Sequence, residues 1–347
     1  MTDRLRVVQW GTGNIGRKAL GAVIEHPNLD LVGVFVYADA KVGLDAGELC
    51  GTAPTGVIAT RSLEDILALA ADCVLYMGDR PDADVLCRLL ESGANVVTTR
   101  GEYHRPASID PDVRRRLEAA CGKGGTTLHA TGSSPGFVTE ALPLVLTSLQ
   151  RHLDGLTIDE FADLSSRDSP ELLFDIMGFG KDPAVFGADR WRHGATAFGP
   201  SLNALCDALA LRLDAVESTG EVATARTTVQ MAAGTVEAGT VAAQRMSVIG
   251  IRGGRPLVTF RANWYCTRDI EPEWDLRETG WRLVVEGDAP LDVAIFFPVA
   301  DEHYAATSPG YTAHRPVNAI AAVCAAAPGI RTTAELPQII AHLGPAS

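Results

Sequence analysis

The chain has 347 residues, of which 46% are hydrophobic, and its formal net charge is −13. This acidic balance argues against partners that carry dense negative charge, so nucleic acids and anionic membrane surfaces are excluded as partners. The length favours two domains over one compact core.

The cysteines give no sign of cross-links or metal sites. The seven cysteines are scattered, with no C-x-x-C pair and no histidine cluster at metal-ligand spacing. This pattern predicts reduced thiols, without a disulfide framework or a structural zinc site. The first strand begins within about five residues of Met1, and no run of eighteen apolar residues follows. We therefore expect a cytoplasmic protein with no signal peptide and no membrane span.

The N-terminal strand, residues 6–10, leads directly into a glycine-rich turn with the pattern G-x-G-x-x-G. A helix over residues 17–25 and a second strand over 29–36 complete a βαβ unit around it, which is the arrangement that binds a dinucleotide diphosphate. In this pattern the first glycine permits the tight turn, the second lets the backbone approach the phosphates, and the third lets the helix pack on the sheet. The free N–H groups of the helix then face the diphosphate. We predict that the cofactor is held by the turn and the start of the helix, namely Gly11, Thr12, Gly13, Asn14, Ile15, Gly16 and Arg17.

Strands and helices continue to alternate up to about residue 131. Strands are expected at 73–77, 95–99 and 126–130, and helices at 83–91 and 111–121, the latter opened by Asp110 and Pro111. This alternation predicts an α/β fold with a doubly wound parallel sheet, a Rossmann domain. Ligands bind outside the carboxyl ends of such strands, which makes Met77, Gly78 and Ser133 candidate cofactor contacts. The neighbouring Asp79 and Arg80 are interpreted as structural or cofactor-edge residues.

The second half of the chain is richer in β-branched segments. Strands are expected at 157–164, 221–229, 234–251, 257–265 and 281–286, with a tight turn at 252–255, and a helix at 200–211. These predict a second, α+β domain built on an open antiparallel or mixed sheet. An alanine-rich helix beginning near Val317 is expected to return to the first domain. The predicted divisions are residues 1–131, 132–310 and 311–347.

The loop after the second strand bears on the choice of cofactor. NAD enzymes usually place an acidic residue about 20 positions beyond the glycines, at the strand tip. Val36 and Tyr37 stand there instead, and Asp39 comes slightly late. Lys41 offers a cation to the extra phosphate of NADP, and Arg17 could assist. We predict that NADP is preferred and that NAD is tolerated.

Four stretches together resemble the superfamily of dihydrodipicolinate reductase-like dehydrogenases, and within it the 2,4-diaminopentanoate dehydrogenase and native amine dehydrogenase group. They are V-Q-W-G-T-G-N-I-G at residues 8–16, K-V-G-L-D-A-G-E-L-C-G at 41–51, G-S-S-P-G-F at 132–137 and R-P-V-N-A-I at 315–320. The resemblance implies a Rossmann domain, a substrate-binding and dimerisation domain on an open sheet, and a last helix that packs on the first domain, with Asn318 near the cofactor. It also implies NAD(P)-dependent oxidative deamination of a small amine, or the reverse reductive amination of a ketone or aldehyde with ammonia, in a homodimer.

The same resemblance places a catalytic glutamate after the fifth strand, and Glu102 is the residue at that place. Glu102 is therefore the candidate catalytic residue, and with Phe137 it is a candidate substrate contact. Dihydrodipicolinate reductases proper carry an adjacent pair of histidines, which this sequence lacks. Two alternatives stay open: a related dehydrogenase acting on an amino acid or aldehyde, and a non-catalytic sensor that binds a dinucleotide.

Several other residues are given ordinary structural roles. His104, close to Glu102, is a candidate proton relay but is interpreted as a surface histidine. Of the aromatic residues Phe137, Phe161, Phe174, Trp264 and Trp274, we expect one or two to line a substrate pocket. Asp301, Glu302 and His303 are interpreted as a solvated turn, because consecutive residues rarely converge on one ion. No metal site is predicted.

Overall fold

The computed structural model describes residues 4–78 and 80–344, and these divide into two compact units. Unit 1 comprises residues 1–137 and 308–347, and unit 2 comprises residues 138–307. The divisions expected from the sequence, after residues 131 and 310, stay a prediction. Within the described residues, no helix is both long and apolar enough to cross a bilayer.

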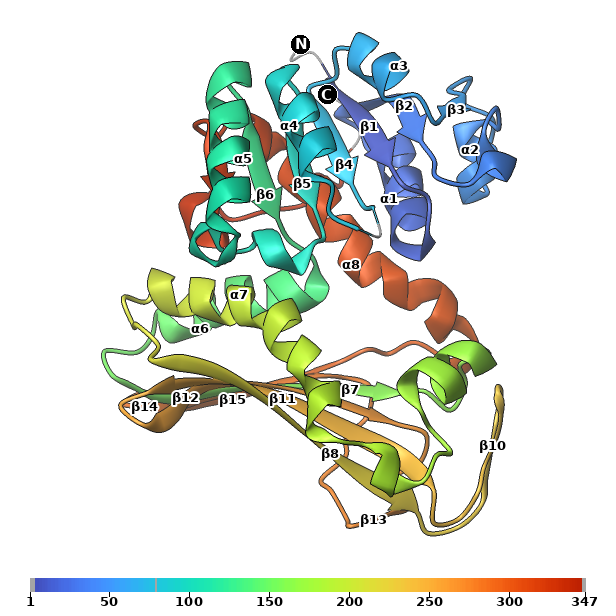
Figure 1. Ribbon diagram of the computed structural model, residues 1–347, viewed down its shortest axis with the longest axis vertical. Helices are drawn as coiled ribbons and strands as arrows, with labels where there is room; N and C mark the ends of the chain where they lie inside the picture. The colour runs from blue at the N-terminus through green and yellow to red at the C-terminus, as the bar shows by residue number, and fades with distance from the viewer. Residues whose placement is uncertain (1–3, 79, 345–347) are drawn as a thin grey trace. The chain divides into compact units, whose positions relative to one another are not determined.

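Unit 1 is built on a parallel sheet with the strand order β16-β6-β5-β4-β1-β2-β3, covered by helices on both faces (Figure 1). From β1 the sheet is extended on one side by β2 and β3 and on the other side by β4, β5 and β6, which is the strand order of doubly wound folds. The predicted Rossmann fold is therefore confirmed. The strands are β1 (Leu5–Trp10), β2 (Leu29–Phe35), β3 (Ala59–Thr60), β4 (Cys73–Tyr76), β5 (Asn95–Thr98), β6 (Thr127–Ala130) and β16 (Gly329–Arg331).

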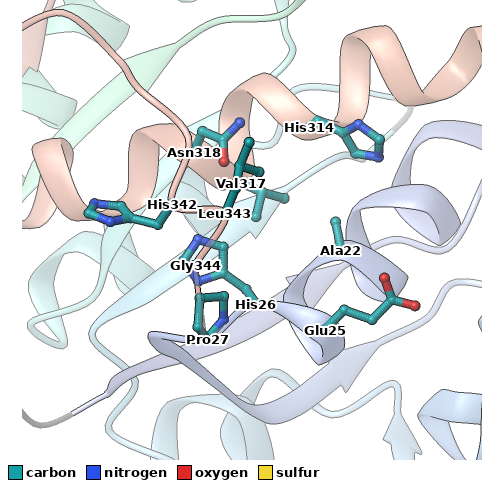
Figure 2. Close-up of a pocket in the computed structure, with 10 residues that line it drawn as sticks. All are labelled: Ala22, Glu25, His26, Pro27, His314, Val317, Asn318, His342, Leu343 and Gly344. Atoms are coloured by element: carbon teal, nitrogen blue, oxygen red, sulfur yellow. The ribbon is translucent and has the colours of Figure 1, made fainter. Parts of the chain in front are cut away.

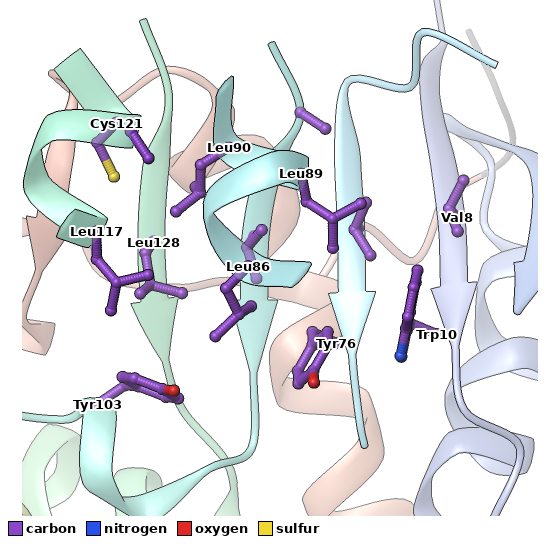
Figure 3. Close-up of a cluster of buried hydrophobic side chains, with 14 of the residues drawn as sticks. Val8, Trp10, Tyr76, Leu86, Leu89, Leu90, Tyr103, Leu117, Cys121 and Leu128 are labelled. Atoms are coloured by element: carbon purple, nitrogen blue, oxygen red, sulfur yellow. The ribbon is translucent and has the colours of Figure 1, made fainter. Parts of the chain in front are cut away.

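The helices of unit 1 bury apolar stripes against the two faces of this sheet. On one face α1 and α8 contribute Ala19, Val23, Val317 and Ile320 to a cluster with the inward residues of β1 and β4. Figure 3 shows the cluster on the other face, where leucines of α4 and α5 pack over β4, β5 and β6. The helices are α1 (Asn14–Glu25), α2 (Ala46–Cys50), α3 (Leu63–Ala68), α4 (Ala83–Glu91), α5 (Pro111–Gly124) and the part of α8 (Asp301–Cys324) that follows residue 307.

The α8 helix starts earlier than the sequence predicted. We expected a helix from Val317 and a solvated turn at residues 301–303, but these residues form the first turn of α8. Pro309 and Pro316, which lie inside the helix, are the reason for the error, since proline usually marks a boundary. The part of α8 from Ala313 onward packs in the core of unit 1.

Unit 2 is built on a mixed sheet with the order β13-β8-β11-β12-β7-β14-β15, in which only the β12–β7 pair is parallel among the pairs described. The strands are β7 (Leu153–Asp163), β8 (Ala215–Ala225), β11 (Val241–Arg252), β12 (Arg255–Tyr265), β13 (Ile270–Glu271), β14 (Gly280–Gly287) and β15 (Leu291–Phe296). The predicted open sheet is confirmed, although β8 begins before its predicted start and the expected strand at 234–251 is split. Its first part, β10 (Gly234–Val236), pairs with β9 (Val229–Met231) in a separate ribbon.

One face of this second sheet is covered by α7 (Arg192–Ala208), and α6 (Leu142–Thr147) contacts β14. Phe198 of α7 stacks on Phe260 of β12, with ring centroids 4.3 Å apart. The helix begins well before the predicted residue 200, because Pro200 lies inside it. At the turn predicted for residues 252–255, Gly253 and Gly254 both have positive φ, and Arg252 pairs with Arg255 across a tight hairpin.

Candidate active site

The loops that leave the carboxyl ends of the unit 1 strands hold most of the predicted site residues. These strands are parallel, so their carboxyl ends lie along one edge of the sheet. The glycine turn follows β1, Tyr37 follows β2, Met77 follows β4, Glu102 follows β5, and Ser133 follows β6. Residues distant in sequence are therefore brought to one edge.

The glycine turn has no room for side chains at two positions. Gly11 has a φ of +86°, and a Cβ atom there would lie 2.8 Å from the carbonyl oxygen of Met77. A Cβ atom on Gly16 would collide with the carbonyl oxygen of Gly11. Gly13 differs, because it is exposed and a Cβ atom on it would meet nothing within 4 Å. The space above Gly13 is thus open to a ligand that approaches the backbone.

The N-terminus of α1 is suited to an anion. No side chain caps it, and its first turn contains no acidic residue. The first N–H groups of a helix lack partners within the helix and carry the positive end of its dipole. An uncapped helix end over an open glycine is the cradle that a diphosphate needs. The residues present therefore fit a dinucleotide.

Lys41 lies against the same turn. Its Nζ donates to the carbonyl oxygen of Thr12 at 2.9 Å and to the Thr12 Oγ1 at 3.2 Å. The ammonium group is therefore held beside the glycine turn. Arg17 lies in the first turns of α1 and is exposed.

A hollow of about 520 Å³ lies beyond the turn, on the face of the sheet that carries α4. Trp10 stacks on Phe35, with centroids 3.6 Å apart and rings 7° from parallel, and the Trp10 Nε1 donates to the Tyr37 hydroxyl at 2.8 Å. Burial raises the pKa of the Tyr76 phenol, which stays neutral. The rings of Trp10, Phe35 and Tyr76 are buried, so the accessible part of the wall is formed by Tyr37 and residues 80–82. The lining residues are Trp10, Phe35, Tyr37, Tyr76, Arg80, Pro81, Asp82 and Val85.

Glu102 lies in a short 3₁₀ turn, Gly101–Tyr103, directly after β5. Its Oε1 accepts hydrogen bonds from the Arg100 Nε at 3.0 Å and from a terminal nitrogen of the same guanidinium at 2.9 Å. Both side chains are about 30% exposed, so the pair is partly shielded but reachable. Burial, with a further contribution from the charge of Glu102, raises the pKa of Tyr103 to about 12. The carboxylate is thus presented on an ordered turn.

The loop after β6 is tied to α8 by polar contacts. The Ser133 and Thr312 hydroxyls are 2.6 Å apart, and the Arg315 Nε donates to the Thr131 Oγ1 at 3.0 Å. The Arg315 guanidinium also lies 5.5 Å from the centre of the Phe137 ring. The Thr131 N–H donates to the carbonyl oxygen of Thr98, which joins this loop to the end of β5. The predicted residues Ser133 and Phe137 therefore belong to a connected group near the end of β5, the strand that Glu102 follows.

The remaining predictions have mixed outcomes. Met77 and Gly78 follow β4, and Gly78 packs against the Tyr37 hydroxyl, whereas Asp79 lies outside the described residues. The prediction for His104 was wrong, because its side chain is only 1% exposed. Of the aromatic residues considered for a substrate pocket, Phe161 lies in a core cluster of unit 2, and Phe174, Trp264 and Trp274 pack at the edges of its clusters. That one or two of them line the pocket stays a prediction.

Asn318 lies elsewhere on unit 1. It lines a hollow of about 590 Å³ between the C-terminal end of α1, α8 and the tail at residues 342–344. Figure 2 shows Asn318 and His314 on α8 facing the end of α1 at Glu25 and His26. A cofactor contact for Asn318 stays a prediction. Among the described residues, no group of histidine, cysteine or acidic side chains could hold a metal ion.

The sequence reasoning missed three cations and one hydroxyl at this edge of the sheet. Arg100 and Arg315 were passed over although the first stands two residues before Glu102 and the second opens the R-P-V-N-A-I motif. Arg61 follows the short edge strand β3, which no pattern indicated. Thr312 has no sequence signal of its own, since its role depends on the packing of α8.

Comparisons with known proteins agree over the whole chain. The family model of the dihydrodipicolinate reductase N-terminus matches residues 5–90, and that of the 2,4-diaminopentanoate dehydrogenase C-terminal domain matches residues 137–347. The chain is 33% identical to the amine dehydrogenase of Streptomyces virginiae, with 96% of each chain covered. It is 21% identical to the 2,4-diaminopentanoate dehydrogenase of Acetoanaerobium sticklandii, over 99% of this chain and 96% of that one.

The fold has a close counterpart among solved structures. The amine dehydrogenase from Mycobacterium smegmatis superposes with a TM-score of 0.75 at 21% identity, covering 98% of both chains. With a family model over more than half of the chain and a relative above 30% identity, the resemblance seen in the motifs is confirmed. The chain belongs to the family of 2,4-diaminopentanoate dehydrogenases and amine dehydrogenases, with an N-terminal domain of the dihydrodipicolinate reductase type.

Proposed function

We propose that this protein is an NADP-preferring amine dehydrogenase. It converts a small amine, water and NADP⁺ to a ketone or aldehyde, ammonia, NADPH and a proton, and it also runs the reverse reductive amination. The observation that carries the proposal is the carboxylate of Glu102, which Arg100 holds after β5 at the edge of the sheet where the dinucleotide cradle lies. Whole-chain similarity to an amine dehydrogenase supports it.

Each part of the sheet edge has a task in this proposal. Residues 11–16 and the start of α1 hold the diphosphate, and the aromatic hollow beside Trp10 receives the adenine. The loops after β5 and β6 receive the nicotinamide, with Ser133 as a contact. When bound, the nicotinamide takes up the hydride from the carbon that carries the nitrogen. All other steps fall to side chains of this protein.

Glu102 acts as the general base in the proposed reaction. An alkylammonium has a pKa of about 10, so at pH 7 the substrate arrives protonated and must lose a proton before the hydride can leave. Arg100 engages Oε1 of Glu102, and among the described residues no hydrogen bond reaches Oε2. Oε2 is the oxygen that takes this proton. The same carboxylate then orients the water that attacks the iminium carbon, and its charge stabilises the cation.

The preference for NADP follows from the tip of β2. Val36 and Tyr37 leave no carboxylate at the place where NAD enzymes bind the ribose hydroxyls, and the next acidic residue, Asp39, is paired with Arg61. Lys41 and Arg17 supply positive charge along the path of the dinucleotide. NAD binds as well, because the cradle and the hollow do not depend on the extra phosphate.

A substrate screen tests the proposal against its alternatives. Simple ketones, aldehydes and keto acids are incubated with ammonia and NADPH or NADH, and loss of the absorbance of the reduced cofactor is followed. Turnover of neutral ketones or aldehydes only in the presence of ammonia supports amine dehydrogenation. Turnover confined to keto acids would favour an amino-acid dehydrogenase, and cofactor binding without any turnover would favour a sensor.

We further propose a homodimer formed through the face of the second sheet that α7 leaves open. Arg245, Ser247 and Ile249 alternate on β11 with the buried residues of the helix-covered face. On the neighbouring strands the open face carries an ion pair between Arg261 and Asp159, whose atoms approach to 2.6 Å. Light scattering at micromolar concentration measures the mass, and a monomer would contradict this assembly. The free state of all seven cysteines fits the cytoplasm as the site of action.

A further inference from the structure

Arg61 directly follows β3, the edge strand that pairs with β2, and it is level with the tip of β2. β2 and β3 run parallel, with Phe35 opposite Thr60, and the Val36 N–H donates to the carbonyl oxygen of Thr60 at 2.9 Å. Arg61 comes directly after Thr60, so it lies beside the step from Val36 to Tyr37. That step is where the ribose of an adenosine is recognised in dinucleotide-binding folds.

The guanidinium of Arg61 is held in place by Asp39 only, among the described residues, and through one of its nitrogens. The two side chains are 49% and 88% exposed, respectively. Ion pairs this exposed stabilise a protein by about 0–1 kcal/mol, so this contact is easily exchanged. A guanidinium has five N–H donors, and the pair with Asp39 uses only one nitrogen of Arg61.

Lys41, the cation expected from the sequence to meet the extra phosphate, is engaged elsewhere. Its ammonium donates to both oxygens of Thr12, next to the open backbone of Gly13. It is therefore placed for the diphosphate side of the cradle. Arg61, on the far side of β2 from β1, is placed for the ribose side.

We propose that Arg61 binds the 2′-phosphate of NADP, exchanging the carboxylate of Asp39 for the phosphate, and thereby sets the preference between the two dinucleotides. The proposal rests on the proposed function to the extent that this function requires a nicotinamide dinucleotide. A phosphate accepts a bidentate pair of hydrogen bonds from a guanidinium, which the solvated hydroxyl of NAD does not replace. Asp39 competes with the phosphate in this arrangement, since it occupies the same guanidinium and bears the same sign of charge.

Binding of cofactor to the full-length protein tests the proposal without any turnover. Dissociation constants for NADPH and NADH are measured by fluorescence titration for the wild type, Arg61→Gln and Asp39→Asn. We expect Arg61→Gln to raise the dissociation constant of NADPH at least tenfold and that of NADH less than twofold. Asp39→Asn should tighten NADPH severalfold, and this gain should disappear in the Asp39→Asn/Arg61→Gln double variant.

Two further variants serve as controls. Arg88 forms a similarly exposed pair with Glu64, with a separation of 2.7 Å, so Arg88→Gln removes an equivalent charge and should leave both constants unchanged. Lys41→Ala should weaken both cofactors by similar factors. Melting temperatures confirm that each variant is folded.

An unchanged ratio of NADPH to NADH affinity in Arg61→Gln would overturn the proposal, and so would a ratio that shifts in Lys41→Ala but not in Arg61→Gln. A failed substrate screen with a shifted ratio in Arg61→Gln would refute the proposed amine chemistry while supporting the role of Arg61. The two ideas are thus tested separately.

Discussion

Arg100 directs two nitrogens of its guanidinium at a single oxygen of Glu102, with distances of 3.0 and 2.9 Å to Oε1. The two residues are separated only by Gly101, and the 3₁₀ turn brings their side chains together. This geometry fixes the orientation of the carboxylate through Oε1, and no hydrogen bond from the described residues reaches its second oxygen. In the proposed reaction one oxygen anchors the group and the other exchanges the proton.

Replacing Glu102 with glutamine tests the proton transfer. Glutamine keeps the shape of the side chain but cannot accept the substrate proton, so turnover of amine should fall by at least about a hundredfold. Dissociation constants for NADPH should barely change, because Glu102 is assigned to the substrate. A variant that retains more than about a tenth of wild-type turnover would rule out this mechanism, and a loss confined to cofactor binding would make Glu102 a structural residue.

Replacing Arg100 with methionine tests the anchoring. Methionine has a similar length but releases Oε1, and a misplaced catalytic group costs about ten- to a hundredfold in turnover. We expect turnover to fall within this range while NADPH affinity stays within twofold. Arg115→Met, which removes an exposed pair with Asp112 on α5, is the matched control and should be neutral. Unaltered turnover in Arg100→Met would show that the carboxylate needs no anchor.

Replacement by alanine should lower the stability of the protein at one glycine of the turn and the affinity for cofactor at another. Gly11→Ala should destabilise the protein by about 1–2 kcal/mol or more, because its φ is positive and its Cβ would press on Met77. Gly13→Ala should leave the melting temperature unchanged, since nothing lies within 4 Å, but should weaken cofactor binding at least tenfold by occupying the diphosphate space. Thermal unfolding and fluorescence titration measure the two effects. Normal NADPH binding by Gly13→Ala would place the diphosphate elsewhere.

The half-buried His26 should make stability depend on pH. Burial, the neighbouring His342 and the Arg4 guanidinium hold the pKa of His26 below its ordinary 6.5, and its Nδ1 accepts a hydrogen bond from the Asn28 N–H. The unfolded chain therefore binds this proton more readily than the native protein. Stability is complete above pH 6.5 and decreases as the pH falls from 6.5 toward the lowered native pKa.

Melting temperatures at pH 7.5 and 5.5, without cofactor, measure this dependence. His26→Gln should show a smaller decrease between the two values than the wild type, and His193→Gln, at an exposed position of α7, should match the wild type. An equal decrease in His26→Gln would assign the effect to other groups, among them His314, whose pKa is also lowered by burial.

Local sequence signals predicted, to within a few residues, the strands β1, β2, β4, β5 and β6 and the helices α1, α4 and α5. The short elements α2, α3 and β3 were missed. Asp110 accepts from the N–H groups of Asp112 and Val113 ahead of α5, as its place before a proline indicated. In the second half, α7 and α8 continue through prolines that sequence rules treat as boundaries. Packing of these helices on a sheet overrides the local preference of proline, and such tertiary packing cannot be read from the pattern of a single sequence.

The residues of the candidate site also fall into those with a local sequence signal and those without one. The glycine turn and Glu102 could be proposed from motifs, since each follows a strand that hydrophobic pattern alone indicates. The partners of these residues depend on tertiary contacts: Thr312 reaches Ser133 across 179 positions of sequence. Burial of His104 beside an otherwise polar turn likewise depends on what packs around it.

The parallel pairing of β16 with β6 has a consequence for the order in which the chain matures on the ribosome. Gly329 stands opposite Thr127, so the edge of the unit 1 sheet is closed by residues made some two hundred positions later. Unit 2 is continuous in sequence, and all of it is synthesised before α8 is complete. Domains usually form in order of synthesis. In this protein unit 2 can complete its folding before unit 1, because unit 1 lacks α8 and β16 until the end of synthesis.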